Sequence, residues 1–418
     1  MEMIFTCRKM NCFSVRRSSS ETRRLLCKNE QREGQMTAIE EEERGWSKVK
    51  DGRLKSTTAR TSVLRALMND FLNEHSGGGT RLHMAASLAD EATCRRLVEE
   101  GADVGARCSD FSATVLHYAA LNGSHGEGLI TYFVSLGIDA CVTDEDGLEP
   151  IHYALRVGNL GIANMLLRLR RGAPGSSGDS LLHFCVRHKL IRPAKVVLER
   201  HRWLLETPEE MGRTPLHLAA AVADVRICEW LLKEGASVTA MCGVYGGTAL
   251  HHMAMNDSEG AENLVDLFLS RGADIEARTS ARETPLQVAL LQGNLRTAKR
   301  LIQLGADCTV RNKNGYNLLQ VCLEKNLINS ARFVLDYNRE QLFEMCGPGG
   351  ETALHVAARY CDLPTCEWLV RNGADPNAIS NDGFGIPPLE MAKLNDMWFD
   401  ELLAFFDKFS NVVRETKV

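Results

Sequence analysis

The chain has 418 residues, of which 44% are hydrophobic and 25% charged, the composition of an ordinary soluble protein. Its net charge of −5 and isoelectric point near 6.2 argue against a general nucleic-acid binder, and its longest apolar runs are too short to span a membrane. The fourteen cysteines include no Cys-x-x-Cys pair, which argues against a metal site and favours reduced thiols in a cytosolic or nuclear protein.

Residues 1–60 differ in composition from the rest of the chain. The first 32 residues hold eight basic and three acidic side chains, a net charge of +5, and the acidic run Glu40 to Glu43 follows. We therefore expect a disordered tail, in which Arg16-Arg-Ser-Ser-Ser20 is the kind of sequence that basic-directed kinases accept. An Arg- and Ser-rich start also leaves a mitochondrial transit peptide open, and Met36 is an alternative start codon.

Residues 61–76 have the apolar spacing of a helix. The segment opens with Thr61-Ser62, closes before Ser76-Gly-Gly-Gly79, and carries a stripe of Val63, Leu64, Leu67, Met68, Phe71 and Leu72. This pattern predicts a capping helix that covers the first unit of an array, and a partner-binding helix is the alternative.

A seven-residue phrase recurs from Thr80 to the C-terminus. Four close copies run Thr80–Ala86, Thr114–Ala120, Thr214–Ala220 and Thr352–Ala358, and weaker ones start at Glu149, Ser180, Thr248, Thr284, Asn317 and Pro387. The central aliphatic residues of these ten copies, from Leu82 to Leu389, are 31 to 36 residues apart. Such a constant period is the signature of a repeat array.

Each copy carries the signals of two helices and a turn. Thr214 can cap a helix whose first position suits Pro215, and a second helix then ends at Gly235. Turn residues follow, as in Asn312-Lys-Asn-Gly315. A single unit of this size cannot bury its apolar face, so we expect stability to come from stacking between neighbours.

These phrases, with Gly-Ala stops such as Gly101-Ala-Asp103 and Gly373-Ala-Asp375, resemble ankyrin repeats over about four fifths of the chain. The resemblance implies an all-α solenoid of stacked helix-turn-helix units over residues 77–393, with β-hairpin or turn loops that project from the stack. It also implies a protein-interaction scaffold, which we expect to be monomeric. It further implies a structural role for the fourth residue of the phrase, a position that we call the repeated slot. This slot holds His83, His117, His152, His183, His217, His251 and His355, with Gln287, Gln320 and Glu390 in other copies.

Some copies depart from the pattern. The copies that start at Ser180 and Asn317 lack the Gly-Ala stop, and each is followed by a regular copy containing Cys-Glu-Trp-Leu. This favours an internal duplication, and we expect the two irregular units to bend the stack in two similar places. Another copy has the insertion Asn122 to Gly128 between its helices, which forms either a tolerated loop or part of a binding edge.

The sequence offers no catalytic group. The histidines outside the repeated slot are scattered, and no nucleophile, base and orienting group can be assembled from them by spacing. Gly77-Gly-Gly79 lacks the Lys that a phosphate-binding loop requires. We therefore expect neither catalytic residues nor a cofactor, and a protein that is not an enzyme.

Partner-binding candidates follow from the resemblance, which places contacts on the hairpin tips and the inner helix face. The tip side chains most suited to anchor a protein partner are Tyr245, Arg278, Arg282, Arg311, Lys313 and Tyr316. The four cations lie on adjacent hairpins and could face an acidic segment.

The C-terminal segment 394–418 is rich in aromatic residues. One helical stripe is Trp398, Leu402, Phe405 and Phe409, and a second is Phe399, Leu403 and Phe406. Two stripes cover more than half of a helix, so this is either a large cap or a docking helix. The docking alternative makes the protein an adaptor, such as the substrate-recognition subunit of a ubiquitin ligase or a signalling complex, although no SOCS-box or F-box sequence is recognisable.

Overall fold

The computed structural model describes residues 79–109, 111–169, 180–222, 224–243, 245–256, 260–344, 346–381 and 384–415. The chain divides into residues 1–74 and 75–418, and all described residues lie in the second unit. The expected tail over 1–60 and the expected capping helix over 61–76 lie outside the described residues.

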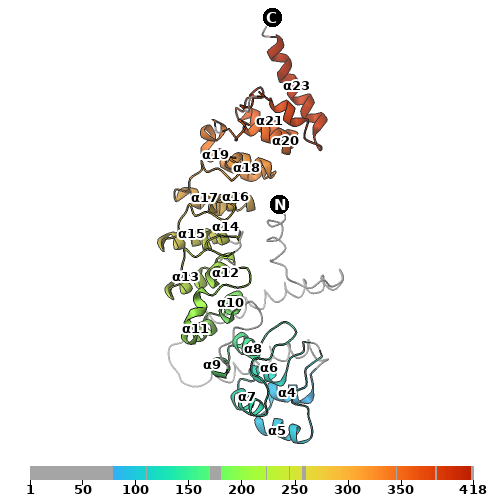
Figure 1. The fold of residues 1–418 in the computed structure, drawn as a ribbon, viewed down its shortest axis with the longest axis vertical. Helices are drawn as coiled ribbons and strands as arrows, with labels where there is room; N and C mark the ends of the chain where they lie inside the picture. Colours follow the sequence, from blue (N-terminus) through green and yellow to red (C-terminus); the bar gives the residue numbers. More distant parts are fainter. Residues whose placement is uncertain are drawn as a thin grey trace, which may run out of the picture. The chain divides into compact units, whose positions relative to one another are not determined.

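The described residues of the second unit form ten consecutive helical pairs (Figure 1). The pairs are α4 (Arg81–Leu88) with α5 (Glu91–Glu99), α6 (Val115–Leu121) with α7 (Gly126–Ser135), α8 (Pro150–Val157) with α9 (Leu160–Leu169), α10 (Leu181–Arg187) with α11 (Ile191–Arg200), α12 (Pro215–Ala221) with α13 (Val225–Lys233), α14 (Ala249–Ala254) with α15 (Ala261–Ser270), α16 (Pro285–Gln292) with α17 (Leu295–Gln303), α18 (Leu318–Glu324) with α19 (Ile328–Glu344), α20 (Ala353–Tyr360) with α21 (Leu363–Arg371), and α22 (Pro388–Ala392) with α23 (Phe399–Glu415). A 3₁₀ helix, η2 (Arg202–Glu206), follows α11.

The first helix of each pair begins where the sequence predicts. In α16, Thr284 Oγ1 accepts from the Gln287 N–H at 3.3 Å, and Gln287 Oε1 accepts from the Thr284 N–H at 2.9 Å. This reciprocal cap satisfies two backbone donors that a helix start otherwise leaves unpaired. The same box recurs in α12, where Thr214 pairs with His217 and Pro215 takes the first helical position.

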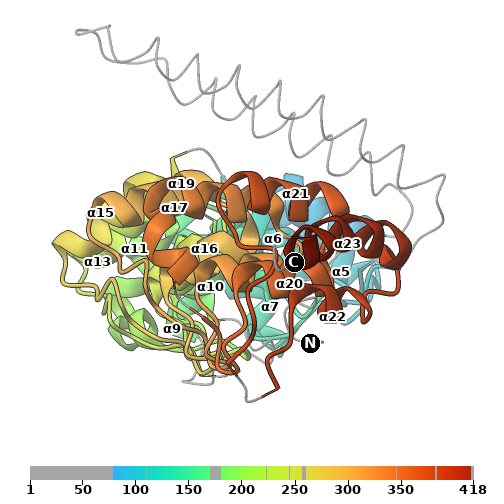
Figure 2. The ribbon, with the colours of Figure 1, turned by 90° about the horizontal axis from the view of Figure 1, so that it is seen from above.

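The pairs stack through two layers of helices. First helices pack on the first helices of neighbouring pairs, most second helices do likewise, and each pair is joined internally. The core lies between the layers, where the repeated Leu and the two Ala of the phrase are buried, as in Leu216, Ala219 and Ala220. Figure 2 shows the layers end on, with the loops of many pairs gathered at one edge.

The projecting loops contain turns, and no residue of the described ranges is assigned to a strand. Neighbouring loops nevertheless bond to each other through their backbones. The pairs are Glu145 N–H to Phe111 O at 2.8 Å, Gly243 N–H to Gly212 O at 3.2 Å, Ser280 N–H to Tyr245 O at 3.0 Å, and Asn381 N–H to Gly349 O at 3.0 Å. The loops therefore form a connected edge on the stack.

The two irregular copies differ in secondary structure. In the first, α11 ends at Arg200 and η2 follows, whereas α19 of the second continues without a break for 17 residues. The break lies at His201, whose φ of −128° and ψ of 64° are not helical, and Pro208 then ends η2, because a proline disfavours helix in the residue before it and Thr207 is extended with φ −68° and ψ 127°. The two irregular copies therefore differ in secondary structure, and similar bends of the stack at both places stay a prediction.

Candidate functional site

The repeated histidine joins several of the pairs to the next loop, whereas His83 Nε2 and Gln287 Nε2 in the same position are buried without such a bond. The Thr214 N–H donates to His217 Nδ1 at 3.1 Å, so this nitrogen is an acceptor and the ring proton is on Nε2. His217 Nε2 donates to Ala240 O at 3.0 Å and to Gly247 O at 3.1 Å. Equivalent bonds run from His117 to Leu148 O, His183 to Arg213 O, His251 to Glu283 O, His355 to Ile386 O and Gln320 to Glu351 O, at 2.6 to 3.0 Å. The predicted structural role of this slot is confirmed.

Burial keeps these imidazoles neutral. Desolvation is the largest effect on His217 and His251 and lowers the pKa of each to about 4, although the carbonyl acceptors oppose the shift. If Nδ1 were protonated, it and the threonine N–H would both be donors and could not bond to each other. The arrangement therefore suits hydrogen bonding between repeats and leaves no free base for proton transfer at these rings.

A second inter-repeat clamp was not anticipated from the sequence. Asn122 Nδ2 donates to Ala86 O at 3.1 Å and to Ala89 O at 2.9 Å, at the end of the first helix of the preceding pair. The same bond is made by Asn159 to Ala120 O, Asn256 to Ala221 O, Asn294 to Ala254 O and Asn395 to Ala358 O. The recurrence of Asn after the first helix was the signal available in the sequence.

The predicted cationic tip residues fall into two groups. Arg278 and Arg282 are exposed on the loop between α15 and α16, and Lys313 is exposed on the next loop. Arg282 has φ 63°, and the Arg278 guanidinium reaches only the Arg282 carbonyl, at 3.3 Å. Among the described residues none of these three side chains forms an ion pair within bonding distance, although the charge of Arg278 acts to lower the pKa of Glu276 and that of Lys313 acts to lower the pKa of Glu283. The three side chains are thus exposed, with carboxyl groups nearby.

Arg311 differs from the other three cations because its guanidinium is already bound. Its Nη1 donates to Gly315 O at 2.6 Å and to Cys346 O of the following loop at 2.7 Å. Arg107, six residues after Gly101 as Arg311 is after Gly305, makes the equivalent pair of bonds to Ser112 O and Thr143 O. Arg311 thus joins neighbouring loops, a role that the sequence analysis missed.

The two predicted tyrosines are half-buried, Tyr245 against its own loop and Tyr316 against the loop that follows. The Tyr245 ring lies 6.4 Å from the His251 ring and 6.1 Å from the His252 ring. A Cβ at Gly247 would come within 2.6 Å of the Tyr245 ring, and one at Gly347 within 2.9 Å of the Tyr316 ring. Each ring therefore covers a glycine backbone. Their proposed role as anchors for a partner stays a prediction.

The aromatic and aliphatic residues of the C-terminal segment differ in how deeply they are buried. Leu402 and Phe406 are buried, and α23 packs on α22 and α21. Phe405 and Phe409 are half-buried and their rings contact each other, with centroids 5.2 Å apart. Trp398 precedes α23 and is 37% exposed. One part of the segment covers the last repeat and another part faces solvent.

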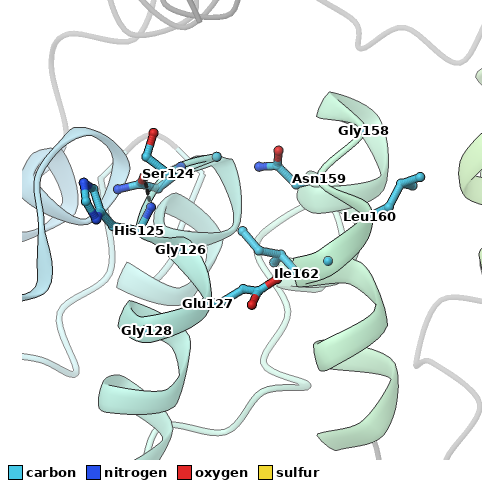
Figure 3. A pocket seen from close by; sticks show the side chains of 12 residues that line it. Ser124, His125, Gly126, Glu127, Gly128, Gly158, Asn159, Leu160 and Ile162 are labelled. Atoms are coloured by element: carbon cyan, nitrogen blue, oxygen red, sulfur yellow. Dashed lines mark hydrogen bonds between the residues drawn. The ribbon is translucent and has the colours of Figure 1, made fainter. Parts of the chain in front are cut away.

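The insertion between α6 and α7 borders a groove of about 410 Å³ (Figure 3). Ser124, His125 and Glu127 line it, which are residue types that catalysis can use. Glu127 lies instead against α9, since a Cβ at Gly161 would be 2.2 Å from its Oε1. The His125 ring points away from Glu127 in Figure 3, and no hydrogen bond joins these three side chains in the described structure.

The described ranges contain no group of three or more His, Cys, Asp or Glu side chains placed to hold a metal ion. Among the described helices, none has both the length and the hydropathy that crossing a membrane requires.

Comparison with known families agrees with this geometry. The family model "Ankyrin repeats (3 copies)" matches residues 82–174, 241–312 and 286–380, and the model "Ankyrin repeat" matches residues 211–242. The chain belongs to the ankyrin repeat proteins. As in other ankyrin arrays, its repeats constitute a protein-interaction domain.

Several relatives share parts of the ankyrin array. The human "Transient receptor potential cation channel subfamily A member 1" is 32% identical over 187 residues, which is 43% of this chain and 16% of that protein. The mouse "B-cell lymphoma 3 protein homolog" is 30% identical over 203 residues, or 47% of this chain and 45% of that protein. The crystal structure of the ankyrin repeat domain of Bcl-3 aligns with a TM-score of 0.46 and 25% identity over 55% of this chain and all of that one. The chain thus spans less than half of these curated relatives.

Proposed function

We propose that this protein is a non-enzymatic scaffold that binds a protein partner through its loop tips and the inner helix face of the array. The observation that carries this proposal is the exposed set of Arg278, Arg282 and Lys313 on two adjacent loops. Their backbones are held by turns and by bonds such as Ser280 N–H to Tyr245 O. Because the backbone is fixed in advance, binding does not require the loops to order, and the three cations favour an acidic segment of the partner.

We also propose that the protein works in a reducing compartment of the cell, as its cysteines indicate. Cys185, Cys228 and Cys322 are buried thiols that form no disulfide in the described structure, and burial raises the pKa of Cys185 and Cys322 to about 12. Such thiols are unreactive and pack as small apolar side chains. This supports a reducing compartment, the cytosol or the nucleus.

Charge reversal tests the loop surface. In the variant Arg278→Glu, Arg282→Glu, Lys313→Glu we expect capture of the partner to fall at least about tenfold, because attraction becomes repulsion at the contact. The melting temperature should stay nearly unchanged, since exposed substitutions have small effects on stability. Capture from a cell lysate by the full chain, quantified by mass spectrometry, measures the first effect and thermal unfolding measures the second.

The matched control reverses three exposed cations on the second helices, Arg192, Lys195 and Arg296. This control has the same net charge and should capture the partner normally. Equal loss in both variants would show a general charge effect and reject the loop site. Arg311 is left intact in both variants because its bonds to Gly315 O and Cys346 O serve the fold.

A second candidate function is an adaptor that recruits another complex through its C-terminus. The exposed side chains at the start of α23, Met397, Trp398 and Phe399, favour it. Deletion of residues 395–418 is a poor test, because it also removes the Asn395 clamp and the buried Leu402. Substitutions at the exposed positions separate docking from folding.

A further inference from the structure

Four large apolar side chains are exposed together where α22 meets α23. They are Leu394 at 57% exposure, Met397 at 82%, Trp398 at 37% and Phe399 at 40%. They fall within six consecutive residues, and we call them the C-terminal apolar cluster. Grouped exposure of this kind marks interaction sites, whereas single exposed apolar residues are ordinary.

A buried asparagine fixes the backbone that carries the cluster. Asn395 Nδ2 donates to Ala358 O at 3.1 Å and to Cys361 O at 2.9 Å, both in the preceding repeat. Its Oδ1 accepts from the Met397 and Trp398 N–H groups, each at 3.2 Å. The exposed side chains therefore project from a backbone that is already ordered, which lowers the entropic cost of binding.

The fold does not require apolar residues at these positions. Asn122 makes the same clamp in the second repeat, where its Oδ1 accepts from the Ser124 N–H at 3.2 Å and the His125 N–H at 3.0 Å. Ser124 and His125 thus stand where Met397 and Trp398 stand in the last repeat. Because polar residues serve in an identical turn, the apolar pair is not needed to close the array.

Acidic side chains surround the cluster. Asp396 precedes Met397, Trp398 and Phe399, and Asp400 and Glu401 follow them; all three acidic residues are exposed. The nearby Lys393 is paired with Glu390 at 2.7 Å, so it does not offset them. The cluster thus combines apolar contact area with a net negative charge, which repels nucleic-acid and anionic lipid phosphates.

We propose that the C-terminal apolar cluster docks a basic amphipathic helix of a partner protein. The apolar face of that helix covers Met397, Trp398 and Phe399, and its Lys or Arg residues face Asp396 and Asp400. This inference rests on the adaptor role proposed above and specifies the chemistry of the docked element. The loop cations Arg278, Arg282 and Lys313 favour an acidic segment, whereas the cluster favours a basic one. One chain can therefore hold two different partners.

The test uses the full chain and two labelled 18-residue model peptides, a Leu–Lys amphipathic helix and its Leu–Glu counterpart. Fluorescence anisotropy should show binding of the Leu–Lys peptide and at least about tenfold weaker binding of the Leu–Glu peptide. The variant Met397→Ser, Trp398→Ser should weaken the Leu–Lys complex at least about tenfold, since it removes the apolar contact. Asp400→Lys, Glu401→Lys should weaken it as well.

The matched control places serine at two exposed apolar positions elsewhere, Leu136 at 47% and Met241 at 59% exposure. It should bind the Leu–Lys peptide as the parent chain does. Equal binding by all variants, equal binding of both peptides, or binding of single-stranded RNA or anionic vesicles at the cluster would overturn the proposal. Circular dichroism confirms that each variant is folded.

The adaptor role is measured separately, by the proteins that copurify with the full chain and with Met397→Ser, Trp398→Ser. If the peptide binds at the cluster but the variant copurifies with the same proteins as the full chain, the docking surface is retained and the adaptor role is rejected. A lost protein without peptide binding would retain the adaptor role and reject the basic helix as its ligand.

Discussion

Lowering the pH from 7 to 4.5 should destabilise the array by roughly 2 kcal/mol for each of His217 and His251. Their pKa values fall from an ordinary 6.5 to about 4 in the folded chain, chiefly because burial disfavours the charged ring. Between these values the unfolded chain binds more protons than the folded chain. The stabilisation is therefore complete above pH 6.5 and is lost as the pH falls toward 4.

Glutamine provides the matched variant, because Gln320 occupies the same slot and bonds to Glu351 O at 2.6 Å. The variant His217→Gln, His251→Gln should remain folded at pH 7 and lose less stability on acidification than the parent chain. Urea unfolding at pH 7, 6, 5 and 4.5 gives the slope of the free energy of unfolding against pH for the parent chain and for the variant. Identical slopes would show that these two rings do not carry the acid sensitivity.

Leu216→Ala should lower the free energy of unfolding by about 2–5 kcal/mol. The side chain is 1% exposed between the two helical layers, and truncation leaves a cavity that the stack cannot fill. In a repeat array the damage should concentrate in the repeats next to the cavity, since each repeat contacts only its neighbours. Hydrogen exchange followed by mass spectrometry should show faster exchange in α10 to α14 than in α20 to α22.

The control for this prediction is Leu136→Ala, because that leucine is 47% exposed after α7. Its cost should stay within about 0.5 kcal/mol. A loss below about 1 kcal/mol for Leu216→Ala, or faster exchange spread evenly along the chain, would contradict a stack held by nearest neighbours.

The parts of the fold that the sequence predicts are those set by local spacing. Thr284 and Gln287 lie three residues apart and form the cap that their types imply. The period of the phrase likewise predicts the helical pairs. Local chemistry decides these features, so they can be derived without knowing where distant segments lie.

The missed features depend on partners in another repeat. Arg311 bonds to Cys346 O and Asn122 to Ala86 O, 35 and 36 residues away along the chain. Spacing alone does not show where such side chains point. In the C-terminal segment α23 begins at Phe399, and Trp398 stands directly before it, with its N–H bonded to Asn395 Oδ1 and its carbonyl accepting from the Leu402 N–H at 3.0 Å.

Hydrogen exchange of the full chain with and without its captured partner tests the proposed mode of binding most directly. We expect slower exchange in the bound state at the loops over residues 274–283 and 307–316, where Arg278, Arg282 and Lys313 lie. Slower exchange confined to the opposite connections, such as residues 122–128, with the two loops unchanged, would contradict binding through the loop tips.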